Sequence, residues 1–243
     1  MHQPDKHQFF KPALYMALAL LMLQPVVRAA PPSGVLMAPE LEARAIYYRS
    51  QNKTLINSEG LQEKEGAGGL QLSGDALSPH RALTFSFWWK LNSTPGKDGG
   101  FGLFALTGKG WISDFARSGP WCGLTRPAAV LQVYNFSGIR NINLIYDYDI
   151  VAHALQKTGE LHHTAIVISG GMQVIVYRDG AIVCDCRLTG RSFSEADLMH
   201  NLTLGGDGVT LQEIFILRGA IGTRELEEYV RGTRQLRTAW GMK

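Results

Sequence analysis

Short runs of alternating apolar and polar residues recur along the chain from about residue 66 to residue 218. Gly, Pro, Asn and Asp separate these runs and favour turns, whereas helical periodicity is scarce here. The spacing predicts an all-β domain, a two-sheet antiparallel β-sandwich with a short C-terminal helix. The strands that we expect are 69–74, 83–90, 130–134, 142–146, 163–168, 173–177, 181–184, 202–205 and 212–217.

Residues 83–90 show the clearest strand pattern. Leu83 and every second residue after it are apolar, which predicts one buried face. The intervening residues are mostly polar and predict a solvent-exposed face, with Trp88 as the exception. Asp179-Gly180 stands between two apolar runs and predicts a tight hairpin, because both residues tolerate positive φ.

Helical signals concentrate near the C-terminus. Thr223 can cap a helix that reaches Leu236, with glutamates in its first turns and Arg231, Arg234 and Arg237 at its cationic end. These arginines complement the helix dipole, and a basic anchoring face is the alternative. A single helical turn is also expected over 194–199.

The N-terminal segment has the pattern of a secretory signal peptide. Lys11 precedes an apolar run of 11 residues, 13–23, and Val27-Arg28-Ala29 provides a cleavage pattern. A bilayer-spanning helix needs about 20 apolar residues, so we expect no permanent span, although a retained anchor is the alternative. We therefore expect a signal peptide at 1–29, a leader at 30–45, the β-sandwich domain at 46–236 and a tail at 237–243. The predicted location is secreted or extracytoplasmic, which means the periplasm or the cell surface in a bacterium.

The charge of the expected mature chain is close to neutral. The full sequence has 24 Lys and Arg against 21 Asp and Glu. Removing the first 29 residues takes away Lys6, Lys11, Arg28 and Asp5, which leaves 21 positive and 20 negative side chains. A domain with this balance lacks the basic footprint of nucleic-acid binders.

Three cysteines, Cys122, Cys184 and Cys186, lie in the part expected to be exported, where disulfides persist. Cys184 and Cys186 are two apart in an expected strand, at the edge of disulfide geometry. We therefore expect a disulfide between Cys122 and either Cys184 or Cys186, with one cysteine left over.

The order of several short motifs resembles the laminin-G-like and concanavalin A-like lectin-glucanase superfamily. The matching segments are 69–75 (GLQLSGD), 85–90 (FSFWWK), 160–167 (ELHHTAIV), 176–180 (VYRDG), 202–206 (LTLGG), 211–216 (LQEIFI) and 226–228 (LEE), with 46–48 (IYY) similar to a preceding strand. Leu161 and Gln212 depart from the family's usual Trp and Asp. The resemblance implies the jelly-roll fold and the binding of sugars, glycoconjugates or proteins, without fixing one activity.

Signals for catalysis and for metal binding are sparse. Glycoside hydrolases of this fold need paired carboxylates, typically as an E-x-D-x-E strand, and the sequence contains no such strand. An enzyme built from distant carboxylates is an alternative function. Calcium is a candidate ligand, for which Asp147 and Asp149 offer oxygen atoms, although acidic residues are also common turn formers.

The segment 107–127 is long for a sandwich loop and carries aromatic and charged residues. An exposed Trp can stack on a sugar ring while Arg or Asp binds hydroxyl groups, and pinning of the loop to the sandwich is the alternative. The predicted site consists of Trp111, Asp114, Arg117, Trp121 and Arg126. The predicted function is an exported binding or adhesion module for a carbohydrate, a glycoconjugate or a protein, and a purely structural envelope protein is the third hypothesis.

Overall fold

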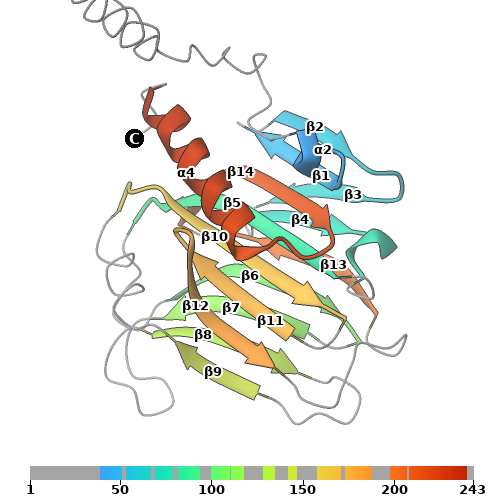
Figure 1. The fold of residues 1–243 in the computed structure, drawn as a ribbon. Helices are drawn as coiled ribbons and strands as arrows, with labels where there is room; N and C mark the ends of the chain where they lie inside the picture. Colours follow the sequence, from blue (N-terminus) through green and yellow to red (C-terminus); the bar gives the residue numbers. More distant parts are fainter. Residues whose placement is uncertain are drawn as a thin grey trace, which may run out of the picture. The chain divides into compact units, whose positions relative to one another are not determined.

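Two antiparallel sheets, each of seven strands within the described residues, form the computed structural model (Figure 1). The structure describes residues 39–50, 53–66, 69–78, 82–93, 100–109, 111–117, 128–134, 142–146, 158–170, 173–187, 198–206 and 208–239. The prediction of an all-β, two-sheet sandwich with a C-terminal helix is confirmed.

Sheet A has the strand order β12-β11-β10-β5-β14-β1-β2. Its strands are β1 (Ala45–Ser50), β2 (Lys53–Asn57), β5 (Leu83–Leu91), β10 (His162–Ser169), β11 (Gln173–Arg178), β12 (Ala181–Arg187) and β14 (Val209–Arg218). Asp179 and Gly180 link β11 to β12 with φ of 50° and 93°, so the predicted hairpin is confirmed.

Sheet B has the order β3-β4-β13-β6-β7-β8-β9. Its strands are β3 (Gln62–Gly66), β4 (Gly69–Ser73), β6 (Gly100–Gly108), β7 (Trp111–Arg117), β8 (Ala128–Tyr134), β9 (Ile142–Tyr146) and β13 (Met199–Leu204). The helical elements in the described ranges are α2 (Pro39–Glu42), the 3-10 turn η1 (Asp75–Leu77) and α4 (Thr223–Ala239). No helix among the described residues is long and apolar enough to cross a membrane.

The core lies between the two sheets and follows the predicted alternation. Phe85, Phe87 and Trp89 of β5 are at most 1% exposed and belong to the core. Phe85 packs edge to face on Phe104 of sheet B, with ring centroids 5.0 Å apart. Each such side chain stabilises the folded state by about 1.5–3 kcal/mol when it is buried away from water. Burial of this apolar layer therefore favours the packing of the two sheets.

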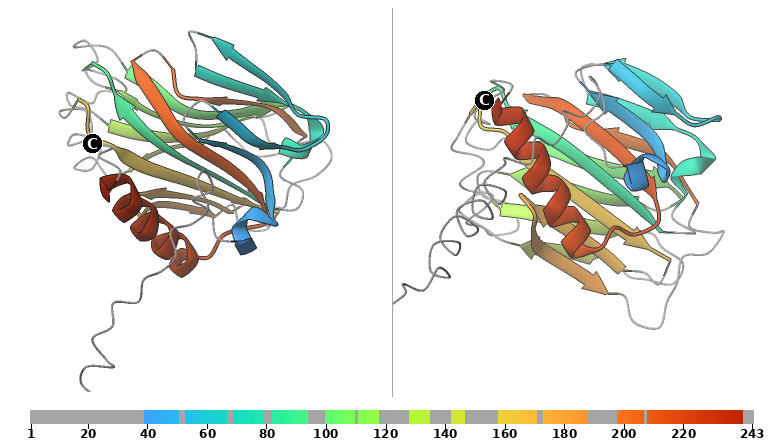
Figure 2. Two further views of the ribbon diagram at one scale, coloured as in Figure 1. Left: turned by 90° about the horizontal axis from the view of Figure 1, so that it is seen from above. Right: turned by 45° about the horizontal axis from the view of Figure 1, so that its top comes forward.

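The second face of β5 is buried as well, which corrects the prediction of a mostly solvent-exposed face. Thr84, Ser86 and Trp88 are at most 1% exposed. Helix α4 lies across this face of sheet A (Figure 2). Tyr229 of α4 packs on Phe215 of β14 with ring centroids 4.8 Å apart. Trp88 is therefore part of a second apolar layer, between the sheet and the helix.

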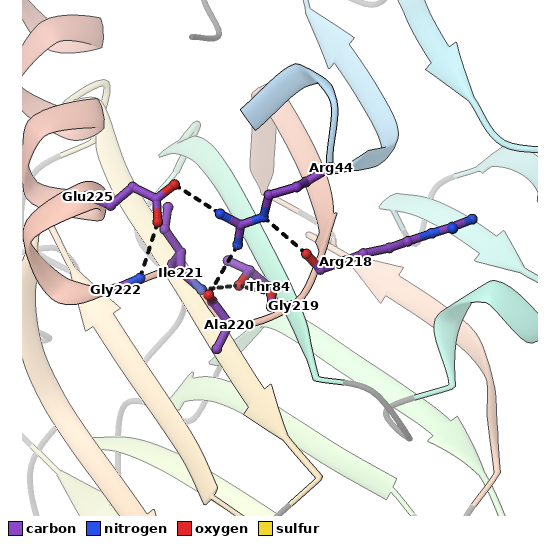
Figure 3. Close-up of polar contacts among 8 residues, drawn as sticks. All are labelled: Arg44, Thr84, Arg218, Gly219, Ala220, Ile221, Gly222 and Glu225. Atoms are coloured by element: carbon purple, nitrogen blue, oxygen red, sulfur yellow. Dashed lines mark hydrogen bonds and ion pairs between the residues drawn. The ribbon is translucent and has the colours of Figure 1, made fainter. Parts of the chain in front are cut away.

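Arg44, just before β1, forms hydrogen bonds with both the start of α4 and the end of β14 (Figure 3). Its guanidinium donates to the carbonyl oxygens of Arg218 at 3.2 Å and Ala220 at 3.1 Å, and to Glu225 of α4 at 3.0 Å. The Thr84 hydroxyl donates to the Gly219 carbonyl oxygen at 2.9 Å. These bonds provide partners for backbone carbonyl groups in the turn between β14 and α4.

Candidate functional site

A shallow groove of about 530 Å³ crosses strands β3, β4 and β13 of sheet B. The alternation of these strands explains why it is polar. Leu70, Leu72, Leu202 and Leu204 belong to the core, so the residues between them lie on the opposite face of the sheet. We call this surface the sheet B groove. Its lining residues are Gln62, Glu63, Lys64, Gln71, Leu72, Ser73, Asn201, Leu202 and Thr203.

From the groove, the strand register continues across sheet B in two rows of paired positions. One row contains Lys64, Gln71, Thr203, Ala105, Ser113 and Gln132, and the other contains Gln62, Ser73, Asn201, Thr107, Trp111 and Tyr134. We call these twelve positions the polar rows. Lys64 is the single residue among them that is charged at neutral pH, and hydroxyl and amide side chains predominate. Such side chains both donate and accept hydrogen bonds, as a ligand rich in hydroxyl groups requires.

The charged side chains of β3 lie on two opposite faces of the strand. The guanidinium of Arg49, which is 7% exposed, forms ion pairs with Glu63 at 3.4 Å and with Glu65. The Thr54 hydroxyl donates to Glu63 at 2.9 Å. Lys64 lies between the two glutamates in sequence and therefore points to the other face, into the groove.

Tyr47 of β1 lies beside Glu63, Arg49 and Thr54. Its side chain is 0% exposed, and burial, followed by the negative charge of Glu63, raises its pKa to about 12 despite the opposing influence of Thr54 and Arg49. The phenol is therefore neutral throughout the physiological range and acts as a packing residue.

The residues predicted from the sequence as a site are only partly described. Trp111, Asp114 and Arg117 belong to β7, so the prediction that 107–127 is one long loop is wrong. Trp111 is paired in register with Thr107 and Tyr134, within the polar rows. Asp114 is opposite Phe104 and Leu131, in a row that includes core residues. Arg117 is opposite Gly100 and Ala128, at the strand's end.

Several other predicted residues lie outside the described part of the chain. These are Trp121 and Arg126 of the proposed site, Asp147 and Asp149 of the proposed calcium site, and Cys122. Among the described residues, no cluster of three or more His, Cys, Asp and Glu side chains is arranged to hold a metal ion. The calcium site stays a prediction.

The two cysteines of β12 face the core. Cys184 is 8% exposed and Cys186 is 5% exposed, and they are not bonded to each other. Burial, and to a lesser extent the neighbouring Asp185, raises the pKa of the Cys186 thiol. A buried thiol that resists ionisation is unsuited to nucleophilic chemistry. The bridge to Cys122 stays a prediction.

Ser86 and His163 form a pair that resembles a nucleophile and its base, and that sequence reasoning missed. The Ser86 hydroxyl lies 2.7 Å from Nε2 of His163. Both residues are at most 1% exposed, and the His163 ring packs against Trp88 and against Tyr229 of α4. No substrate reaches this pair while α4 is in place, so we assign it a packing role.

A second cluster of polar side chains lies near the β11–β12 hairpin. Nδ1 of His162 lies 3.0 Å from Asp179, whose other carboxylate oxygen accepts from the His163 backbone N–H at 3.0 Å. The Trp89 indole N–H donates to Thr164 at 2.8 Å. His162 and His163 thus lie on opposite faces of β10, as their adjacent positions predict. These bonds connect β10 to β5 and to the β11–β12 hairpin.

No protein-family model matches the sequence, and no curated protein matches it significantly. Solved structures share its fold. The binding domain of botulinum neurotoxin serotype D has a TM-score of 0.58 and 11% identity, over 82% of this chain and 53% of that one. The binding domain of botulinum neurotoxin DC, in complex with rat synaptotagmin II, has a TM-score of 0.51 and 11% identity, over 79% and 52%.

The same domain in complex with SialylT has a TM-score of 0.51 and 10% identity, covering 78% of this chain and 51% of that one. This chain spans about half the length of these structures. Identities of 10–11% indicate a shared β-sandwich fold and no more. Membership of the laminin-G-like superfamily in particular stays a prediction.

Proposed function

We propose that this protein is an exported binding module that holds an extended glycan against the sheet B groove. The observation that carries the proposal is the composition of the polar rows, in which eleven of twelve register positions are uncharged and most bear an amide or a hydroxyl. An exposed sheet face commonly carries charged Lys and Glu side chains. Neutral amide and hydroxyl side chains can instead exchange hydrogen bonds with sugar hydroxyl groups, and removing them from water costs little free energy.

An aromatic pair supports the same ligand class. Trp111 and Tyr134 are directly opposite each other in register, at the β7–β8 end of the row that begins at Gln62. Aromatic rings combine an apolar face with a polar atom and suit the faces of sugar rings. Trp111 is thus common to the site predicted from the sequence and to the polar rows. The signal-like segment 1–29 supports export, where surface and matrix glycans are found.

The carboxylates that the structure brings together favour binding over hydrolysis. Glu63 and Glu65 are two apart on β3, as in a glycosidase strand, but both bind the guanidinium of Arg49. A glycosidase needs two carboxyl groups that flank the sugar bond, whereas these two are held in ion pairs with one guanidinium. This pair therefore links the two sheets.

A glycan array tests the proposal, with and without calcium. The test variant Gln71→Ala/Thr203→Ala removes two polar side chains from the centre of the groove. The control Gln173→Ala/Thr210→Ala removes the same residue types from β11 and β14 of sheet A. We expect saturable binding by the wild type and the control, and at least a tenfold loss in the test variant, about 1.4 kcal/mol.

The array also separates the alternative functions. Release of reducing sugar from a bound glycan would place the protein among the enzymes. Absence of saturable binding to any glycan would contradict the proposal and leave a protein partner or a structural role. A second test is N-terminal sequencing of the exported protein, for which we expect a start at Ala30, and an intact Met1 there would contradict cleavage.

A further inference from the structure

We infer that Lys64 selects glycans that carry a negative charge, by binding the acidic group at the β3 end of the sheet B groove. This inference rests on the proposed function and specifies its ligand class. It depends on the way the structure separates three neighbouring charges of β3, Glu63, Lys64 and Glu65.

In sequence, the two glutamates flank Lys64 and would neutralise it. In the structure they occupy the opposite face of the strand, because adjacent strand residues point in opposite directions. There both carboxylates are bound by Arg49 of β1, and Glu63 also accepts from Thr54. One guanidinium offsets one of these two negative charges, and both carboxylate side chains lie on the face of β3 opposite to Lys64.

Lys64 is the positive charge on the groove side of β3. It is exposed and forms no ion pair within the described part of the chain. Its register partner is Gln71, followed by Thr203, neither of which carries charge. Asp75, which follows β4, is engaged by His200 at 2.9 Å. An anionic group that enters this end of the groove meets one ammonium group together with amide and hydroxyl donors.

The position of Lys64 also predicts how a bound oligosaccharide is oriented across sheet B. Lys64 is on edge strand β3 and Trp111 is on β7, four strands further across sheet B. At about 4.8 Å between strands, this separation is about 19 Å. A monosaccharide cannot span it, whereas an oligosaccharide can place an acidic unit at Lys64 and neutral rings toward β7.

The experiment compares pairs of oligosaccharides that share a neutral backbone and differ by one acidic group, a carboxylate in one pair and a sulfate in the other. Binding is measured for the wild-type protein and for Lys64→Gln, Lys64→Arg and the control Lys53→Gln. Lys53 is exposed on β2 of sheet A and matches Lys64 in charge and exposure.

We expect the wild type to prefer the acidic member of at least one pair by about threefold to fivefold, the range of an exposed ion pair. Raising the salt concentration should reduce that preference. Lys64→Gln should abolish the preference, while Lys64→Arg and Lys53→Gln should retain it. A preference confined to one pair assigns the charge to carboxylate or to sulfate.

The outcomes separate the two proposals. Failure of every oligosaccharide to bind the wild type would overturn the proposed function and this inference with it. Equal binding of the acidic and neutral members, or a preference that survives Lys64→Gln, would overturn the role of Lys64 alone, because glycan binding would then stand without charge selection.

Discussion

Arg49 of sheet A binds Glu63 of sheet B at 3.4 Å, across the open edge of the sandwich. The contact ties β1 to edge strand β3, which contains no apolar residue of its own. It therefore helps to position β3, which forms one wall of the sheet B groove and whose Glu63 is among the lining residues. The side chains of Arg49 and Glu63 are 9% and 23% exposed, so water screens their attraction only in part.

Replacing Arg49 by Met should destabilise the protein by about 2 kcal/mol, because Glu63 would keep a partly buried and uncompensated charge. Adding Glu63→Gln to this variant should recover part of the loss. Urea unfolding measures both effects. The control Lys53→Met, at an exposed position of β2, should change stability by less than about 0.5 kcal/mol. Equal effects of Arg49→Met and Lys53→Met would contradict the role of the cross-sheet contact.

Tyr47 should make the protein sensitive to alkaline pH. Its pKa of about 12 in the folded protein lies above the value of about 10 for an exposed tyrosine, so the folded state retains a proton that the unfolded chain loses. The resulting stability is fully present below about pH 10 and is lost as the pH rises through about 12.

The comparison with Tyr47→Phe isolates this effect. Between about pH 9 and 11.5 the free energy of unfolding of the wild type should fall by about 2 kcal/mol more than that of the variant. Urea unfolding across this range measures the difference. Parallel pH profiles for the two proteins would show that Tyr47 does not titrate as its burial requires.

The helix α4 should depend on a buried hydrogen bond. The Tyr229 hydroxyl donates to Glu213 at 2.5 Å, and Glu213 is 1% exposed. Tyr229→Phe should lower the free energy of unfolding by about 1–3 kcal/mol, because the buried carboxyl group of Glu213 loses a hydrogen-bond donor. In the control Tyr177→Phe the lost partner is Thr223, at 3.1 Å near the start of the helix, and the cost should be below about 1 kcal/mol. Thermal unfolding that ranks the two variants in the reverse order would contradict this assignment.

The predicted disulfide remains to be tested by peptide mapping without reduction. We expect Cys122 to be linked to Cys184 or Cys186, and the bridge to contribute about 2–4 kcal/mol. Cys122→Ser should then lower the midpoint of unfolding, and a reducing agent should have the same effect on the wild type. Recovery of all three cysteines as alkylated thiols from the exported protein would refute the bridge.

The fold was largely predictable because its core strands repeat a simple pattern. Residues 83–90 alternate apolar and polar side chains, and the strand found there is Leu83–Leu91. The burial of the second face of β5 was harder to predict, although Trp88 and the helix contained the signal. Leu226, Tyr229, Val230 and Thr233 are buried at helical spacing on α4 and require a surface to cover.

The groove could not be predicted from local pattern. Its central strands β4 and β13 lie more than 120 residues apart in the sequence, and only their register brings Gln71 opposite Thr203. Strand β3, with the sequence Gln-Glu-Lys-Glu-Gly, gives no apolar signal for a strand. In β7, Asp114 occupies a register position beside core residues, which obscured the alternation and led to the incorrect prediction of a loop.

The most direct test of the central claim locates a bound glycan on the folded protein. Backbone amide chemical shifts are recorded while an oligosaccharide selected on the array is added to saturation. We predict that the largest shifts occur in β3, β4, β13 and β6, including Gln71 and Thr203, and that they are absent in Gln71→Ala/Thr203→Ala at the same concentrations. Saturable shifts confined to sheet A, or shifts that persist unchanged in that variant, would contradict the assignment of the binding site to the sheet B groove.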